Sequence, residues 1–174
     1  PDRVVSVTNG DDDAAGITVG KTALATAETG AAADTFTVTL NTQPTATVTV
    51  PVTSSDASEG LVRGGSSPST PAASVNLTFT SGNWNVPQTV TVVGQDDLVA
   101  DGNQTFSVAV GAATGAPEYA ALGAQSVSVT NADDDTAGVT LIPSATPIVT
   151  SENGTTGTFT VRLNSQPVSD VVLP

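Results

Sequence analysis

Apolar and polar residues alternate along most of the chain with a period of two. Phe36, Val38 and Leu40 are separated by threonines. The same alternation recurs in the segments 17–19, 48–52, 75–79, 90–92, 106–110 and 127–129. Alternation of this kind predicts strands with one buried and one exposed face. About seven short strands are expected, and two sheets, each covered on one side, predict an all-β, immunoglobulin-like β-sandwich.

One stretch interrupts this pattern. Gly, Ser and Pro dominate residues 60–73. Because these residues are typical of turns and irregular backbone, the segment is expected to be a long exposed loop.

Three blocks of sequence recur in the same order. Residues 6–13 (SVTNGDDD) return as 128–135 (SVTNADDD), residues 15–19 as 137–141, and residues 35–44 as 158–167. The first two blocks recur after 122 residues and the third after 123, so one residue is inserted between them. Recurrence at so regular a spacing indicates a tandem array. We expect residues 1–13 to end one repeat, residues 14–135 to form a complete repeat, and residues 136–174 to begin the next.

The charge and composition exclude several classes of function. The 174 residues include 17 acidic and four basic side chains, with a net charge of −13 and neither His nor Cys. Such a surface cannot neutralise phosphates, so no nucleic-acid partner is expected, and an anionic membrane is disfavoured. Without His or Cys the usual zinc ligands, cysteine nucleophiles and the Ser-His-Asp triad are missing. No apolar run reaches the length of a membrane-spanning helix. We therefore expect that the protein is not an enzyme and does not insert into a membrane.

The acidic residues gather in short clusters between the expected strands. The clusters are Asp11–Asp13, then Asp96, Asp97 and Asp101, and then Asp133–Asp135, with Glu28, Asp56 and Glu59 at other strand ends. Clustered carboxylates repel one another unless solvent or a cation neutralises them. Ca²⁺ prefers six to eight oxygen ligands, so a calcium site is one interpretation and a solvated acidic linker is the other. The spacing does not match an EF-hand.

The segment 77–92 (LTFTSGNWNVPQTVTV), followed by Gly94-Gln95-Asp96-Asp97 and Asp101-Gly102, resembles Calx-β repeats. It is similar to the tandem Calx-β-like repeats of large bacterial surface and secreted proteins. The closing VTNADDD segment at 129–135 fits the same pattern. The resemblance implies a seven-stranded sandwich with calcium ions at the end that meets the next module.

The resemblance also implies a set of metal ligands. They are Glu28, Asp56, Asp96, Asp97, Asp101, Asp133, Asp134 and Asp135. Glu59 is an alternative to Asp56. Asp11–Asp13 would serve the preceding module, and Glu152 would serve the following one.

These observations lead to a hypothesis about function. We expect a non-enzymatic structural module of an extracellular bacterial adhesin or filament, stiffened by Ca²⁺ at the repeat junction. Its partners would be neighbouring repeats, other copies in a filament, or a glycan or cell-surface molecule. Two alternatives are a recognition module that binds glycan or protein through residues 60–73, and a metal-free spacer.

The two ends of the chain carry a further expectation. Residues 3–9 and 139–172 supply only parts of sandwiches, and a lone strand cannot satisfy its backbone hydrogen bonds. We expect these segments to be ordered only through contacts beyond the central sandwich. The contacts would come from a longer chain or from strand addition between copies, which gives a head-to-tail filament.

Overall fold

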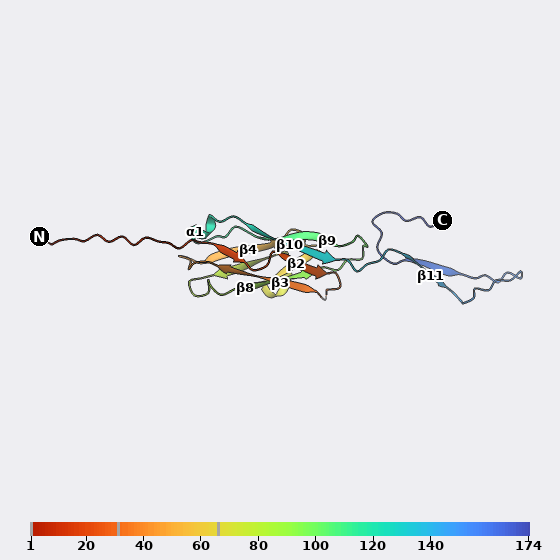
Figure 1. The fold of residues 1–174 in the computed structure, drawn as a ribbon. Helices are drawn as coiled ribbons and strands as arrows, with labels where there is room; N and C mark the ends of the chain where they lie inside the picture. Colours follow the sequence, from red (N-terminus) through yellow and green to blue (C-terminus); the bar gives the residue numbers. More distant parts are fainter. Residues whose placement is uncertain (1, 31, 66) are drawn as a thin grey trace.

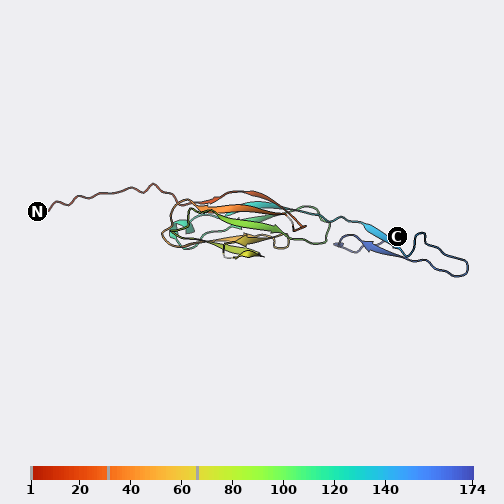
Figure 2. The ribbon, with the colours of Figure 1, turned by 90° about the horizontal axis from the view of Figure 1, so that it is seen from below.

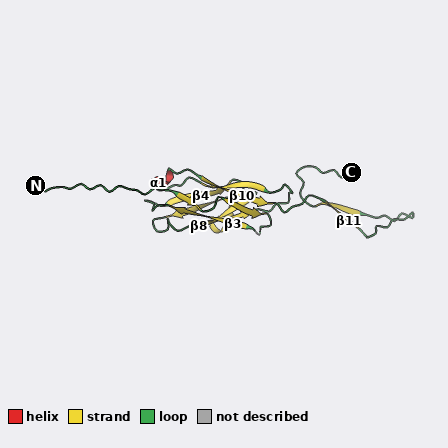
Figure 3. Cartoon of the chain, viewed as in Figure 1, coloured by secondary structure: helices red, strands yellow, loops and turns green. Residues whose placement is uncertain are grey.

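A β-sandwich occupies the middle of an elongated molecule (Figure 1). The structure is a computed structural model that describes residues 2–30, 32–65 and 67–174. An extended segment leads into one end of the sandwich, and a two-stranded hairpin follows the other end (Figures 1 and 2). Strands predominate, and the short helix α1 (Pro117–Ala120) lies at the end nearest the N-terminus (Figure 3).

The sandwich consists of two five-stranded sheets. The first has the order β1 (Ile17–Val19), β3 (Ala33–Leu40), β8 (Gln88–Gly94), β5 (Gly60–Gly64) and β6 (Ser67–Ala72). The second has the order β2 (Ala23–Ala27), β10 (Gln125–Ala132), β9 (Gln104–Val110), β4 (Val48–Ser54) and β7 (Ser74–Phe79). The all-β, immunoglobulin-like sandwich predicted from the alternating pattern is therefore confirmed.

The core lies between the two sheets and is built mainly from valine. On β3, Phe36, Val38 and Leu40 are buried while the threonines between them are not. The same period of two places the apolar residues of β4, β7, β8, β9 and β10 in the core. Aliphatic side chains branched at Cβ suit this pleated, half-buried geometry.

Three strands were not expected from the sequence: β2, β5 and β6. The segment 60–73 is not a long exposed loop, because β5 and β6 pair there in antiparallel fashion and β5 also pairs with β8. Ser66, between β5 and β6, lies outside the described residues. On β5 the buried positions are Gly60, Val62 and Gly64, so two of its three inward residues have no side chain to show the pattern.

The glycine at position 60 makes room for an aromatic ring from the opposite sheet. A Cβ atom built on Gly60 would lie 2.2 Å from Cζ of Phe106. Phe106 is 7% exposed and belongs to the core, so the ring cannot move away without loss of packing. A glycine in this strand therefore marks close packing between sheets rather than a loop.

The two ends of the chain differ in structure. Residues 2–16 contain no strand, and Val5 and Val7 are more than 80% exposed. The C-terminal segment forms the antiparallel hairpin of β11 (Val139–Pro143) and β12 (Phe159–Leu163). The N–H of Gln166 also donates to the carbonyl of Leu98, in the loop after β8. Residues 139–172 were expected to be ordered only through contacts beyond the central sandwich. Instead, β11 and β12 pair with each other, and the turn that follows them bonds to the loop after β8.

We predict that Gly60→Ala destabilises the sandwich by about 1–3 kcal/mol, the range for overpacking a core. The matched control is Gly123→Ala, because a Cβ at Gly123 meets no atom within 4 Å. Urea unfolding of both variants and the parent protein measures the difference. Equal stability of the two variants would show that Phe106 does not constrain position 60.

Candidate metal centre

The strand topology brings one end of several strands together, and the acidic clusters lie there. Strand β2 runs parallel to β10, with Ala27 opposite Ala132, so Glu28 and Asp133 leave the sheet side by side. Strand β8 ends where β5 begins, with Gly94 opposite Gly60. The loop after β8 carries three of the predicted acids, which are Asp96, Asp97 and Asp101.

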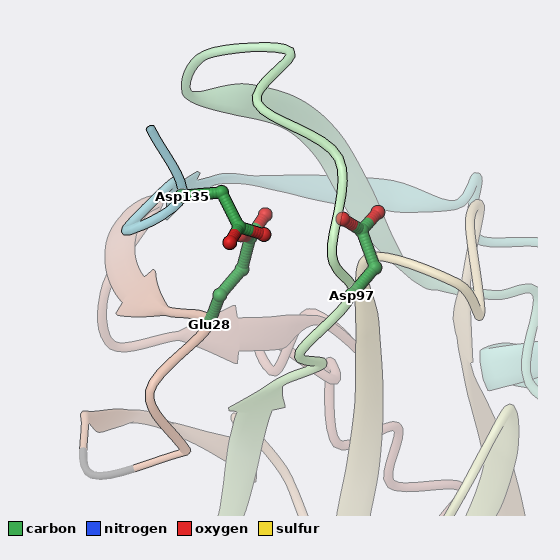
Figure 4. Close-up of side chains that lie close together, drawn as sticks. All are labelled: Glu28, Asp97 and Asp135. Carbon is green, nitrogen blue, oxygen red and sulfur yellow. The ribbon is translucent and has the colours of Figure 1, made fainter. Parts of the chain in front are cut away.

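Two groups of carboxylates lie close enough to share a cation. Glu28, Asp97 and Asp135 each contribute one oxygen, and these oxygens lie within 4.8 Å of one another (Figure 4). Glu59, Asp97 and Asp101 form the second group under the same limit. Asp97 belongs to both groups and could therefore bridge two ions.

Glu28 is the most constrained member of the cluster. Its side chain is 1% exposed, and its Oε2 has no hydrogen-bond partner among the described residues. Burial raises the pKa of Glu28 to about 7, and the negative charges of Asp97, Asp133, Glu59 and Asp101 add to the effect. Within the described part of the chain, Glu28 forms no salt bridge. A buried carboxylate without such a partner lowers the stability of the folded state.

Two further acids, Asp135 and Glu59, also have raised pKa values. Burial raises the pKa of Asp135, with contributions from Asp133 and Asp134, and its Oδ2 is also buried without a partner among the residues described. Burial also raises the pKa of Glu59, although a hydrogen bond from Asn131 opposes the shift. Acids with raised pKa values therefore occur in both groups of carboxylates.

A buried asparagine holds several segments around the site. Asn131 is fully buried near the end of β10, and its Oδ1 accepts a hydrogen bond from the Thr26 hydroxyl at 3.0 Å. Its Nδ2 donates to the Gln95 carbonyl at 3.0 Å and to Oε2 of Glu59 at 3.4 Å. A single amide thus connects β2, β10, the start of β5 and the loop after β8.

Backbone N–H groups hold two more carboxylates in place. The N–H of Val99 donates to Oδ1 of Asp97 at 2.7 Å, within the loop after β8. Asp133 accepts from Gly102 N–H at 2.7 Å through Oδ2 and from Asp135 N–H at 2.8 Å through Oδ1. Asp133 therefore fastens the segment after β10 to the loop after β8.

The eight residues predicted as ligands occupy different positions. The two carboxylate groups include Glu28, Asp97, Asp101 and Asp135. Asp133 braces the loop, whereas Asp96 and Asp134 lie outside both groups and raise the pKa of Asp135 through their charge. Asp56 also lies outside them.

The side chain of Asp56 turns back to Ser58. Its Oδ1 accepts from the N–H and the hydroxyl of Ser58, and this lowers the pKa of the Asp56 carboxyl. Glu59 takes part in the second group instead. Glu59 directly precedes β5, and the inward glycines of that strand leave no alternating pattern in the sequence. No sequence pattern therefore favoured Glu59 over Asp56.

The donor set fits a hard divalent cation. Both groups offer only carboxylate oxygens. The carboxylate of Glu28, whose Oε2 has no hydrogen-bond partner among the described residues, lies beside that of Asp135, with Asp97 within the same distance limit (Figure 4). Ca²⁺ accepts such ligands in flexible geometry and completes its coordination with water and carbonyl oxygens. A cation here would neutralise charges that otherwise repel each other.

Comparison with known proteins supplies no analogy for this site. Neither the family models nor the curated proteins searched match the chain. Within the described residues, no helix is both long and apolar enough to cross a membrane.

We predict that the metal-free protein loses stability as the pH rises from about 4.5 to above 7. The folded protein binds the proton of Glu28 more tightly than the unfolded chain does, because its pKa is about 7 against an ordinary value of 4.5. The stabilisation that protonated Glu28 gives the folded state is fully present below pH 4.5 and is lost as the pH rises through about 7. It amounts to on the order of 3 kcal/mol. Thermal unfolding in chelator at stepped pH measures this slope.

Glu28→Gln removes the titrating group and should flatten most of the slope. The residual slope reports Glu59 and Asp135, whose pKa values are also raised. Glu152→Gln, at an exposed glutamate, is the control and should retain the parent profile. A parent protein whose stability is level over this range would contradict the burial of an uncompensated Glu28.

Proposed function

We propose that residues 14–135 are a structural module of an extracellular tandem-repeat protein, with Ca²⁺ bound at the repeat junction. The observation that carries the proposal is the buried carboxylate of Glu28 beside Asp97 and Asp135, with an Oε2 that has no hydrogen-bond partner among the residues the structure describes. In this proposal the module has no catalytic role. It serves as a stiff unit of an adhesin or filament.

The chemistry of the ligands favours calcium among the common metal ions. Zinc and copper sites draw on His and Cys, and the chain has neither. Mg²⁺ demands near-ideal octahedral geometry and keeps most of its water. A dense cluster of carboxylates on loops suits the larger and more tolerant Ca²⁺ ion.

The position of the site explains how calcium would stiffen an array. Asp135 follows β10 and precedes β11, so it lies in the segment that links the sandwich to the next hairpin. An ion held by Glu28, Asp97 and Asp135 would tie this linker to two points of the sandwich. Linker freedom would then decrease without any new protein contact.

The chemistry of the cluster also supports a location outside cells. Extracellular calcium modules typically bind at 10⁻⁴ to 10⁻³ M, so they fill only where calcium is millimolar. The net charge of −13 matches a highly soluble surface. Both features agree with a secreted or cell-surface protein.

We predict that 1 mM calcium raises the free energy of unfolding by about 0.4–1.4 kcal/mol for each independent site. The gain follows from binding to the folded state alone. Thermal melting in calcium and in excess chelator provides the measurement, with magnesium at the same concentration as the ionic control. Identical melting temperatures in calcium and chelator would leave the metal-free spacer as the better account.

Asp97→Asn should abolish most of the calcium response, because Asp97 belongs to both carboxylate groups. Asp56→Asn is the matched control, since Asp56 lies outside both groups and accepts hydrogen bonds from Ser58. The two variants remove the same charge from the same end of the molecule. A full calcium response in the Asp97 variant would refute the shared-ligand assignment.

A further inference from the structure

The turn after β12 touches the loop after β8. The N–H of Gln166 donates to the carbonyl of Leu98. Val99 and Ala100 line a cavity of about 330 Å³ together with residues of the following hairpin, including Pro167. The hairpin is therefore attached to the sandwich through one short loop, residues 98–100, as well as through the linker.

The same turn exists at the opposite end of the sandwich. Residues 41–44 (NTQP) correspond to residues 164–167 (NSQP). The flanking strands have the same register, with Ile17 opposite Leu40 and Val139 opposite Leu163. The internal repeat of the sequence is thus matched by a repeat of local structure.

The hydrogen bonds inside the two turns also agree. Asn41 N–H donates to the Gly16 carbonyl at 2.9 Å, and Asn164 N–H donates to the Gly138 carbonyl at 2.9 Å. In each turn a threonine hydroxyl bonds the asparagine Oδ1, at 2.7 Å in the first and 2.6 Å in the second. The two turns therefore share their local hydrogen bonds, although Pro44 is buried and Pro167 is exposed.

Helix α1 fixes the first turn on both sides of Gln43. The buried Tyr119 hydroxyl accepts from Thr42 N–H at 3.1 Å and donates to the Thr42 carbonyl. Glu118 accepts from Thr45 N–H at 2.9 Å. Between them Gln43 is exposed, and its N–H has no backbone partner within the described part of the chain. The turn is therefore rigid and presents a free donor.

We propose that the turn at residues 41–44 is a docking surface for the preceding repeat. Its occupant is the loop of that repeat that corresponds to residues 96–101, and the Gln43 N–H donates to the carbonyl equivalent to that of Leu98. Each repeat then carries the donor turn (residues 41–44) at one end and the acceptor loop (residues 96–101) at the other. Successive modules would meet in a defined orientation, because a repeat array is held by nearest-neighbour contacts.

The docking loop also contains two of the proposed metal ligands. Asp97 and Asp101 flank the three residues that face the next module, and Asp97 accepts from Val99 N–H. This step rests on the proposed function. Calcium binding and docking would stabilise the same loop conformation, and such a coupling acts equally in both directions.

Amide hydrogen exchange of the 174-residue chain tests the contact without any metal. Gln43 and Gln166 occupy equivalent turns, so they form an internal pair. We expect the Gln166 amide to exchange at least tenfold more slowly than the Gln43 amide in chelator, because only Gln166 has a partner. Equal exchange at the two sites would overturn the docking contact.

A pair of proline variants tests the coupling. Gln166→Pro removes the donor to Leu98 and should weaken calcium binding by about three- to tenfold, the effect expected for one hydrogen bond. Gln43→Pro makes the same change in the equivalent turn at residues 41–44, where the Gln43 N–H has no backbone partner among the described residues. This variant should leave the calcium affinity unchanged. Calorimetric titration of both variants gives the comparison. Equal calcium affinities of the two variants would refute the coupling between docking and calcium binding. If the parent chain binds no calcium, the proposed function is refuted, and the amide exchange of Gln43 and Gln166 alone decides whether the docking contact exists.

A tandem chain tests the surface at residues 41–44 itself. Residues 14–135 are placed once more before residue 14, so that Asp135 precedes Ala14 as Asp13 does in this sequence. The second copy of Gln43 should then become protected from exchange, and the first copy should not. If both copies exchange at the same fast rate while the protein is folded, the turn is not a docking surface.

Discussion

The parallel pairing of β2 with β10 is the interaction on which the carboxylate cluster depends. It places Glu28 next to the segment that follows β10, and Glu28 N–H bonds the carbonyl of Ala132 at 3.0 Å. Strand β2 lies at the edge of its sheet, so among the described strands its ladder of hydrogen bonds is to β10. Its order comes from β10, and the burial of Glu28 comes with it.

The same dependence explains why both ends of the chain lack strands that the sandwich has. Residues 5 and 7 correspond to Val127 and Val129 of β10, but they have neither a β9 nor a β2 beside them and remain exposed. Residues 147–151 precede Glu152 as β2 precedes Glu28, and they form no strand either. In contrast, β11 and β12 form backbone hydrogen bonds with each other, in the same register as β1 and β3.

The sequence predicted the fold class because the core strands alternate with a period of two. It did not predict β5, whose inward positions are mostly glycine, or β2, whose pairing is with a strand about a hundred residues away. At the site, the clustering of acids was evident, but the choice between Asp56 and Glu59 depended on the start of β5. The bridging role of Asn131 depends on three long-range contacts that no local pattern reveals.

In the proposed function, electrostatic repulsion at one end of the module becomes a means of joining it to the next. The metal-free cluster is unfavourable because the buried carboxylate of Glu28 faces other acids and has no salt bridge among the described residues. A cation would therefore both stabilise the sandwich and restrain the linker. The loop after β8 would serve both purposes, since its carboxylates face the sandwich and its carbonyl at Leu98 faces the following turn.

A crystal structure of the chain grown with millimolar calcium would show whether the carboxylate cluster holds an ion. We expect an ion bound by Glu28, Asp97 and Asp135, with six to eight oxygen ligands at about 2.3–2.6 Å. A second ion is predicted beside Asp97, in reach of Glu59 and Asp101. A folded sandwich whose Glu28 stays buried without any ion at that calcium concentration would contradict the account.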